Sequence, residues 1–486
     1  MACVRDPKNI ALGIGAVTAS AILLWFGSGL YPWWPLMWFA PLPVLLVAIR
    51  APAWEAALAA LCAWFLGTMN LWNYLHDVLH VPSGIVIFEF MVVALAFTIA
   101  VLAFRALARR GDSWSALIAF PALWVSFEYI FNRVTSAGTL ISLAYSQLKF
   151  LPFLQVAAIT GPWGMSFLLL LFPSAIALCV HTYRLRPREA LRIVGASMAL
   201  IGAVLIFGAI RLATPVGGRR VTVGLVVHDA LTARAGRQTK HLIEAYADAA
   251  AFVAKRGAQV IVLPEKIGTI VHPVSESIDS QLQAVANHAN ATLVAGFVHV
   301  AQHGIYNEAR IYSPDSTVRE YHKEHLLAPF ESRFTAGKRL AILRRPSGLW
   351  GIEICKDMDF TGLSRRYGQS GVGLMLVPAW DFRVDWIQHG HAALMRGVED
   401  GFSVVRAAKY GSLYVSNSRG RILAEVMSDS APFATLVAKV PVRHVATPYL
   451  LLGNWFAWLM LLAALATVFR LLRGGRTAHW STPVPE

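Results

Sequence analysis

Three side chains that can do chemistry together lie in the second half of the chain, and two of them end short apolar runs. Glu265 ends "VIVLPE", Lys323 lies in "YHKEHLLAPFE" and Cys355 ends "GIEIC". A carboxylate can take the proton of a thiol. A nearby ammonium favours the thiolate and can hold the negative oxygen of a tetrahedral intermediate. If the three side chains meet, they predict acyl transfer through a thioester on Cys355.

Each of these residues also has a purely structural interpretation. Cysteine is among the most buried residue types, so Cys355 can be a core residue. Glu265 can cap a turn, and Lys323 with Glu331 can belong to a solvated loop. The apolar letters "LLAPF" between Lys323 and Glu331 favour partial burial of that segment, and buried charges need partners.

The composition is that of a membrane protein. Of 486 residues, 56% are hydrophobic and 15% are charged, whereas soluble proteins carry about 25% charged residues. The net charge of +15 comes from arginines grouped between apolar stretches, which is typical of orientation signals, so no nucleic-acid partner is expected. The four cysteines predict neither a disulfide framework nor a zinc site, because no CxxC or Cys/His spacing is present.

The apolar segments predict a bundle of eight transmembrane helices, since a bilayer requires about 20 apolar residues per helix. Seven lie in the predicted bundle at 1–214, and the eighth lies in 448–472. The segments are Ile10–Leu30, Trp33–Ile49, Ala56–Leu75, Gly84–Phe104, Trp114–Tyr129, Gly161–Val180, Ile193–Leu212 and Tyr449–Phe469. The first lacks a small-residue cleavage site after it and is interpreted as a membrane helix.

The basic residues orient these helices. They gather at alternate ends of the apolar segments, so a cytoplasmic N-terminus places every cluster in the cytoplasm, as the positive-inside rule requires. The residues are Arg5, Lys8, Arg50, Arg105, Arg109, Arg110, Arg184, Arg186, Arg188, Arg192, Arg470, Arg473 and Arg476. Residues 215–447 are then expected outside, on the periplasmic side in a bacterium, and 473–486 form a cytoplasmic tail.

The segment 215–447 predicts one α/β domain. Short β-rich runs alternate with amphipathic helical patterns, which is typical of that class. The runs are "VTVGLVV", "QVIVLPE", "ATLVAGFVHV", "GLWGIEIC" and "GVGLMLVPAW". His389 and His391 in "HGH" could indicate a metal, but their i, i+2 spacing on a predicted helix directs them to different faces. We therefore expect no metal site.

These motifs resemble the nitrilase (carbon–nitrogen hydrolase) superfamily, in which a Glu–Lys–Cys triad sits on a four-layer αββα sandwich. The matching positions are Glu265, Lys323 and Cys355, and "PAWDF" and the segment 389–423 resemble later parts of that domain. The membrane segments "ALWVSFEYIF" and "LAYSQLKFLPFLQVAAITGPWGMSFLL" and a final helix after "YLLLGNW" resemble the apolipoprotein N-acyltransferase family. The resemblance spans nearly the whole chain.

The resemblance implies a function for each matched residue. Cys355 would be the nucleophile, Glu265 the base and Lys323 the oxyanion stabiliser. Glu331 matches the family's second glutamate, and Trp380 is retained in "PAWDF". Asp357 stands where the family has a glutamate and can still present a carboxylate.

The family transfers an acyl chain from a phospholipid to the N-terminal amine of a diacylated apolipoprotein. It uses no metal or cofactor. The expectation is a monomeric, multi-pass protein of the bacterial inner membrane. An alternative is a membrane-anchored periplasmic amidase with the same triad, in which water replaces the amine. A third interpretation is a degenerate member that only binds lipid or a partner protein.

Overall fold

The computed structural model describes residues 7–229, 237–272, 274–314 and 317–476. The chain divides into two compact units. A helical unit holds the chain up to Ala137, Ile141–Ala209 and the chain from Gly453 on, and a second unit holds Gly138–Leu140 and Ile210–Leu452. Each unit is described by itself.

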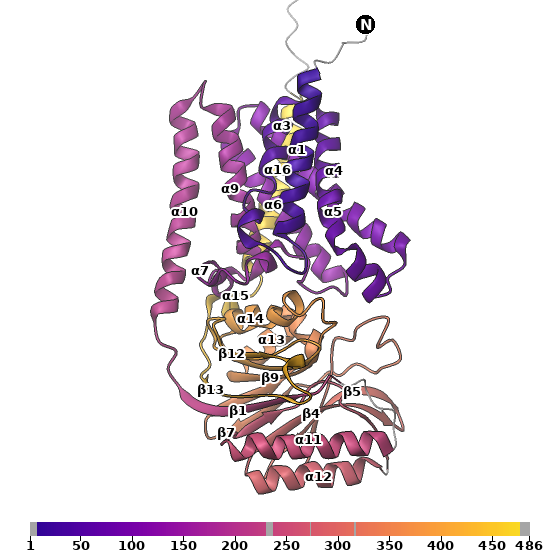
Figure 1. Ribbon diagram of the computed structural model, residues 1–486. Coiled ribbons are helices and arrows are strands. Elements are labelled where there is room, and N and C mark those ends of the chain that lie inside the picture. The colour runs from indigo at the N-terminus through magenta and orange to yellow at the C-terminus, as the bar shows by residue number, and fades with distance from the viewer. Residues whose placement is uncertain (1–6, 230–236, 273, 315–316, 477–486) are drawn as a thin grey trace, which may run out of the picture. The chain divides into compact units, whose positions relative to one another are not determined.

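The helical unit is a bundle of long apolar helices joined by short ones (Figure 1). Its α-helices are α1 (Pro7–Gly27), α2 (Trp34–Met37), α3 (Leu42–Arg50), α4 (Ala53–Thr68), α5 (Ser83–Arg109), α6 (Ser113–Val134), α7 (Leu151–Leu154), α8 (Ala157–Thr160), α9 (Pro162–Thr182), α10 (Pro187–Ala213) and α16 (Trp455–Arg476). Three short non-α turns are η1 (Met69–Leu71), η2 (Tyr74–Val78) and η3 (Leu143–Gln147).

The prediction of eight spanning helices is not confirmed. Within the described ranges, six helices are long and apolar enough to cross a membrane, namely α1, α5, α6, α9, α10 and α16. The predicted segment Trp33–Ile49 is divided into α2 and α3, where Pro41 lies just before α3 and removes a backbone donor. In the segment Ala56–Leu75 the α-helix ends at Thr68, and 3₁₀ and π turns follow.

The second unit is the predicted α/β domain, and it contains two mixed sheets. One has the strand order β13-β1-β2-β4-β5-β6, with β3 also paired to β4, and the other has the order β12-β11-β10-β9-β8-β7. The strands are β1 (Arg219–Val227), β2 (Val260–Val262), β3 (Thr269–Val271), β4 (Thr292–Ala301), β5 (Gly304–Tyr312), β6 (Arg319–His322), β7 (Ala341–Arg345), β8 (Gly348–Ile352), β9 (Val372–Trp380), β10 (Ser403–Lys409), β11 (Ser412–Ser416), β12 (Ile422–Met427) and β13 (Ala434–Val442).

Helices cover the outer face of each sheet, which makes four layers (Figure 1). On one side lie α11 (Arg237–Lys255) and α12 (Val274–Ala289), and on the other lie α13 (Thr361–Gln369) and α14 (Gln388–Asp400). The 3₁₀ turns η4 (Cys355–Asp359) and η5 (Ser428–Ser430) and the short α15 (Pro448–Leu452) complete the unit.

Strand alternation explains the two cores of this unit. Val223 and Leu225 of β1 belong to the core shared with the second sheet. Val226, which points the other way, packs with Tyr246 and Val253 of α11. Successive side chains of a strand face opposite sides, so a run such as "VTVGLVV" serves both layers and is apolar almost throughout. The parallel neighbours β1, β2 and β4, and likewise β8, β9 and β10, bring the ends of these strands to the same edges, where the polar residues collect.

Candidate active site

Lys323 is buried between two glutamates. It follows β6, and its Nζ lies 3.0 Å from Oε1 of Glu265 and 3.0 Å from Oε2 of Glu331. The side chains of all three residues are at most 2% exposed. An isolated charge would not remain at such a depth, so each partner keeps the others ionised.

Two further residues complete this network, and neither is among the candidates indicated by the sequence. Asn307 of β5 donates from Nδ2 to Oε1 of Glu265 at 2.5 Å and to Oε1 of Glu331 at 2.6 Å. Lys266 contacts Glu331 through its Nζ and lies 3.6 Å from Oε1 of Glu265. The network therefore holds two carboxylates and two ammonium groups, with an amide donating to both carboxylates.

A close backbone approach sets the direction of Glu265. The chain leaves β2, passes Pro264 and turns at Lys266, whose φ is +52°. Gly296 of β4 lies against this turn, and a Cβ there would come within 2.6 Å of the Cα of Glu265. Only glycine leaves room for such an approach. Ile267 N then donates to Gly296 O at 2.8 Å, which fixes the turn against the sheet.

Cys355 begins η4, separated by two residues from Ile352, where β8 ends. Its φ is +44°, a left-handed conformation that residues with a side chain rarely adopt. The residue is 6% exposed, and Sγ donates to the carbonyl oxygen of Trp380 at 3.4 Å. The sharp turn places the thiol at a strand end, as a nucleophile requires.

The charges around Cys355 keep the resting thiol protonated. Burial, together with the Glu265 carboxylate, raises the pKa of Cys355 to about 12, although His389 and Lys323 act in the opposite direction. Glu265 and Lys323 therefore both act electrostatically on the thiol. The proton must leave during the reaction, since a free thiolate is not the stable state here.

The two glutamates and the lysine are held in the charged forms that the chemistry needs. Burial alone would raise the pKa of Glu265, but Lys323 and Lys266 lower it below its usual value. The same two cations outweigh burial at Glu331 and lower its pKa to about 2. Burial opposes the charge on Lys323, yet Glu265 and Glu331 raise its pKa above the usual value. At neutral pH the site holds a ready proton acceptor and a permanent cation.

Asp357 joins the Cys355 turn to the segment after Lys323. Its Oδ2 accepts from Ile354 N at 3.1 Å and from the Tyr321 hydroxyl at 2.8 Å. Its Oδ1 accepts from the backbone N of Glu324 and His325 at 3.1 Å and 2.8 Å. A fully buried carboxylate with these donors holds two loops in register, so its contacts position the site.

Trp380 ends β9, next to Cys355. Its carbonyl receives the thiol hydrogen bond, and its ring lies 4.8 Å from Nζ of Lys409. Lys409 also donates to Lys266 O at 2.9 Å. Burial lowers the pKa of Lys409 to about 8. Trp380 and Lys409 thus form one wall beside the network.

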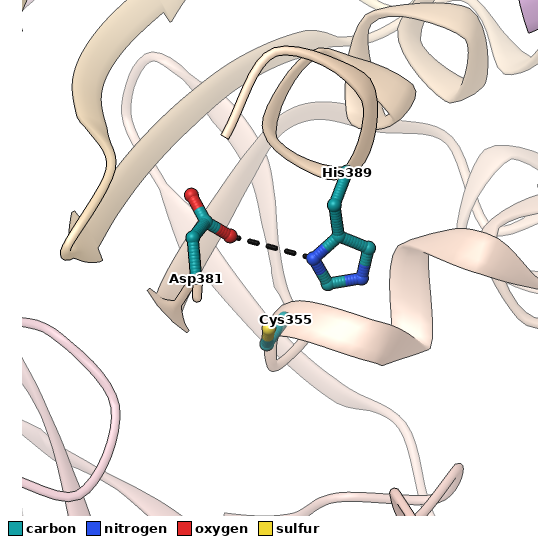
Figure 2. Close-up of side chains that lie close together, drawn as sticks. All are labelled: Cys355, Asp381 and His389. Carbon is teal, nitrogen blue, oxygen red and sulfur yellow. Dashed lines mark hydrogen bonds and ion pairs between the residues drawn. The ribbon is translucent and has the colours of Figure 1, made fainter. Parts of the chain in front are cut away.

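A second charged group beside Cys355 comes from α14 and from the residue after β9. Figure 2 shows Cys355, Asp381 and His389 gathered around one point, with a bond between Asp381 and His389. Their sulfur, oxygen and nitrogen atoms lie within 4.8 Å of one another. Asp381 in turn accepts two hydrogen bonds from Arg406, at 2.8 Å and 2.5 Å.

The structure brings the sequence-derived candidates into one region and adds to them. Glu265, Lys323 and Glu331 are in direct contact, Cys355 is within their electrostatic reach, and Asp357 and Trp380 flank the cysteine. Lys266 could have been found, because it directly follows Glu265. Asn307 had the weaker signal of a polar residue inside an apolar strand.

Comparisons with known proteins agree with this architecture. The family model described as "Apolipoprotein N-acyltransferase N-terminal domain" matches residues 20–175, and the model "Carbon-nitrogen hydrolase" matches residues 230–442. An apolipoprotein N-acyltransferase of Geobacter metallireducens is 26% identical over 87% of this chain and 88% of its own length. That of Vibrio vulnificus is 27% identical over 72% and 74%. An (R)-stereoselective amidase of a Pseudomonas species is 26% identical over 35% of this chain and 61% of its own.

Among solved structures, an amidase from Nesterenkonia sp. aligns with a TM-score of 0.41 and 22% identity, over 47% of this chain and 93% of its own. Nit3 of Saccharomyces cerevisiae aligns with a TM-score of 0.41 and 20% identity, over 47% and 93%. The two family models together match most of the chain, and the apolipoprotein N-acyltransferase relatives match along most of their length. The chain carries an apolipoprotein N-acyltransferase N-terminal domain followed by a carbon–nitrogen hydrolase domain, and it is an N-acyltransferase.

Proposed function

We propose that this protein transfers an acyl chain from a phospholipid to the N-terminal amine of diacylglyceryl-cysteine lipoproteins, in a ping-pong reaction through a thioester on Cys355. The observation that carries the proposal is the buried pair of Lys323 and Glu265 beside a protonated thiol. A carboxylate held ionised, a fixed cation and a nucleophile are the parts that acyl transfer requires.

In the first half-reaction the Cys355 proton passes to the Glu265 carboxylate as Sγ attacks the ester carbonyl carbon of the phospholipid. A carbon–sulfur bond forms, and the carbonyl oxygen becomes an oxyanion beside the Lys323 ammonium. The intermediate collapses, the carbon–oxygen bond breaks, and the leaving alkoxide takes the proton back from Glu265. Lysophospholipid departs and Cys355 keeps the acyl group.

In the second half-reaction the amine of the lipoprotein attacks the thioester carbonyl carbon. Glu265 accepts a proton from the amine, and Lys323 again faces the oxyanion. The carbon–sulfur bond breaks as the amide forms, and the thiolate recovers its proton from Glu265. Each residue thus returns to its starting charge state.

Glu331, Lys266 and Asn307 support the reacting groups. Glu331 accepts a hydrogen bond from the Lys323 ammonium, and Asn307 donates to both glutamates. Lys266 lowers the pKa of Glu265 through its charge, which keeps the base ionised before the reaction. These contacts fix the geometry in advance, which is the main source of electrostatic stabilisation.

The test is incubation of the purified protein with a phospholipid and a diacylated lipopeptide. Formation of triacylated peptide and lysophospholipid supports the proposal. Free fatty acid formed at the same rate with and without the peptide would instead favour a membrane-anchored amidase or other hydrolase, in which water replaces the amine. The Cys355→Ala variant, which is expected to be inactive, is the control for spontaneous hydrolysis.

A second experiment tests the covalent intermediate. Incubation with phospholipid alone, followed by mass spectrometry, should reveal one acyl group on the peptide containing Cys355. The Cys355→Ala variant should carry none. An unmodified Cys355 in protein that turns over would contradict the thioester route, and a chain that neither acylates nor turns over would be a lipid-binding member only.

We also propose that residues 215–447 face the periplasm of a bacterial inner membrane. The clusters of arginine between the apolar helices support this orientation, because such clusters stay in the cytoplasm. A reporter that is active only in the periplasm, fused after Thr214, should be active, and one fused after Arg184 should be silent. The reverse pattern would overturn the orientation.

A further inference from the structure

His389 lies beside the reactive sulfur but has no part in the chemistry described above. One of its ring nitrogens, Sγ of Cys355 and a carboxylate oxygen of Asp381 lie within 4.8 Å of one another (Figure 2). The three residues come from α14, from the first position of η4 and from the position after β9. The cluster is thus built from parts of the fold that meet only in the folded domain.

The hydrogen bonds of His389 define its protonation state. Nδ1 lies 3.4 Å from Oδ1 of Asp381, and Nε2 lies 3.2 Å from Oδ2 of Asp359. Carboxylates accept hydrogen bonds, so both ring nitrogens must carry a hydrogen. A ring with two N–H groups is an imidazolium cation. The side chain is 13% exposed, so water competes little for either bond.

Both carboxylates are themselves fixed. Arg406 donates to both oxygens of Asp381. Lys356 lies 3.8 Å from Oδ2 of Asp359, and the backbone of Asp359 is held by Thr139, whose N donates to Asp359 O at 3.0 Å. The imidazolium therefore lies in a rigid frame of alternating charge, which keeps its position next to the sulfur constant.

We infer that His389 is a permanently protonated positioning residue whose positive charge stabilises the Cys355 thiolate during acyl transfer. The inference rests on the proposed function, since it assigns a role in the same reaction. When the Cys355 proton moves to Glu265, negative charge develops on Sγ. His389 then offers a second cation besides Lys323, from a different element of the fold.

Charged groups of both signs act on Cys355 and His389. Glu265 raises the pKa of the thiol, whereas His389, Lys323 and Arg406 lower it. Burial opposes the charge of His389, but Asp359, Cys355 and Asp381 raise its pKa well above the usual value. Lys356 acts on Asp359 from η4. With these neighbours His389 stays charged through the neutral range, so it does not act as a proton carrier.

The same three ligand types could hold a metal ion, and the geometry favours the imidazolium. Both oxygens of Asp381 already accept from Arg406, and both nitrogens of His389 face carboxylates. A metal would have to displace a proton from His389 and compete with a buried guanidinium. All assays below therefore contain a chelator, which removes metal as a variable.

The test measures alkylation of Cys355 by iodoacetamide, read peptide by peptide with mass spectrometry, in detergent at roughly pH 5 to pH 9. Each unit by which the thiol pKa rises lowers the thiolate fraction about tenfold and raises its nucleophilicity about threefold. In His389→Gln the rate at a given pH should therefore fall by about threefold or more. His389→Lys retains a cation and should recover most of the loss.

His391→Gln is the matched control. His391 lies on the same helix, is 8% exposed and pairs through Nε2 with Glu425 at 2.9 Å, away from the sulfur. Its variant should alkylate at the parent rate, and melting curves show that each variant is folded. A folded His389→Gln protein that alkylates as fast as the parent, or a His389→Lys protein as slow as the glutamine variant, would overturn the inference.

The unmodified protein offers a test that does not depend on a variant. With His389 always charged, the logarithm of the Cys355 alkylation rate should rise linearly with pH. A downward break near pH 6 to 7, where an ordinary histidine loses its proton at about 6.5, would show that the charge is lost and would contradict the inference.

Alkylation needs no lipid substrate, so the two proposals fail separately. If no triacylated product forms but alkylation follows the predicted pattern, the proposed function is contradicted, while the effect of His389 on the thiol still holds. If transfer is observed, His389→Gln should lower kcat by about tenfold with little change in KM, because the charge acts only when the thiolate forms. An unchanged kcat would show that His389 has no role in the reaction.

Discussion

Two buried glutamates, one in each unit, differ in the partners that surround them. Glu128 of α6 accepts from Nε1 of Trp124 and from Leu143 N, both at 2.8 Å, and from the Ser142 hydroxyl at 3.0 Å. These donors are neutral. Glu265 accepts from Asn307 and from the Lys323 ammonium. Each glutamate is 1% exposed, so depth alone does not distinguish them.

The comparison shows how partners separate a structural carboxyl group from a reactive one. The neutral donors around Glu128 join α6 to the η3 turn. In a glutamine, the amide oxygen could accept from Trp124 and Leu143, and the amide N–H could donate to the Ser142 hydroxyl. The cations around Glu265 keep it ionised in a buried place, which a proton acceptor requires and an amide cannot reproduce. The comparison therefore supports Glu265, and not Glu128, as the proposed proton acceptor.

The sharpest test of this comparison is the same substitution at both positions. Glu265→Gln should lower acyl transfer by about 10²- to 10⁴-fold, the usual contribution of a general base. Glu128→Gln should remain close to the parent in activity, because glutamine keeps an acceptor for Trp124 and Leu143. The assay is formation of triacylated peptide. Equal losses at both positions would remove the distinction.

Removing the cation should affect stability as well as activity. Lys323→Met leaves two buried carboxylates short of a partner, and breaking a buried pair costs about 3–5 kcal/mol. Adding Glu265→Gln to Lys323→Met should restore part of the thermal stability, measured in detergent, and none of the activity. Additive losses of stability in the double variant would mean that the pair is not coupled.

Acid should weaken the ion-paired network in a defined range. The pKa of Glu331 is lowered to about 2 in the folded protein, against about 4.3 in an unfolded chain. A carboxyl group whose pKa is lower in the folded protein than in the unfolded chain stabilises the folded state at pH values above the unfolded pKa. This stabilisation, roughly 3 kcal/mol in all, is lost as the pH falls from 4.3 towards 2. In Glu331→Gln the melting temperature should change less with pH across that range than it does in the parent.

The smallest expected effect concerns the second cation. Lys266 lowers the pKa of Glu265, so Lys266→Met should raise it. The acidic limb of the pH–rate profile should then move to higher pH, with activity near neutrality changing only a few-fold. A shift of that limb to lower pH would contradict the assigned influence of Lys266.

Much of the catalytic domain was predictable because its signals are local. The α/β class follows from short apolar runs between helical patterns. Glu265 and Cys355 stand at the ends of such runs, and Lys323 lies shortly before the apolar residues "LLAPF". Glu331 was indicated by the apolar letters around it. These features depend on neighbours in the sequence, which is why they could be identified before the structure.

Other features depend on contacts that sequence spacing does not encode. The pairing of His389 with Asp359 and Asp381 requires three elements to meet, and the sequence spacing of His389 indicated only a possible metal ligand. The eight-helix count is not confirmed, because apolar composition does not show where a helix breaks. Segments Trp33–Ile49 and Ala56–Leu75 are apolar enough, yet the helix in each is interrupted.

The left-handed backbone at Cys355 sets activity against stability at one residue. A side chain at φ +44° costs about 1–2 kcal/mol that glycine would not pay. Cys355→Gly should therefore melt at a higher temperature than Cys355→Ala. In descendants that are no longer selected for activity, replacement of Cys355 by glycine would be favoured, because it relieves the backbone strain. Retention of cysteine at this turn is therefore expected where activity is still under selection.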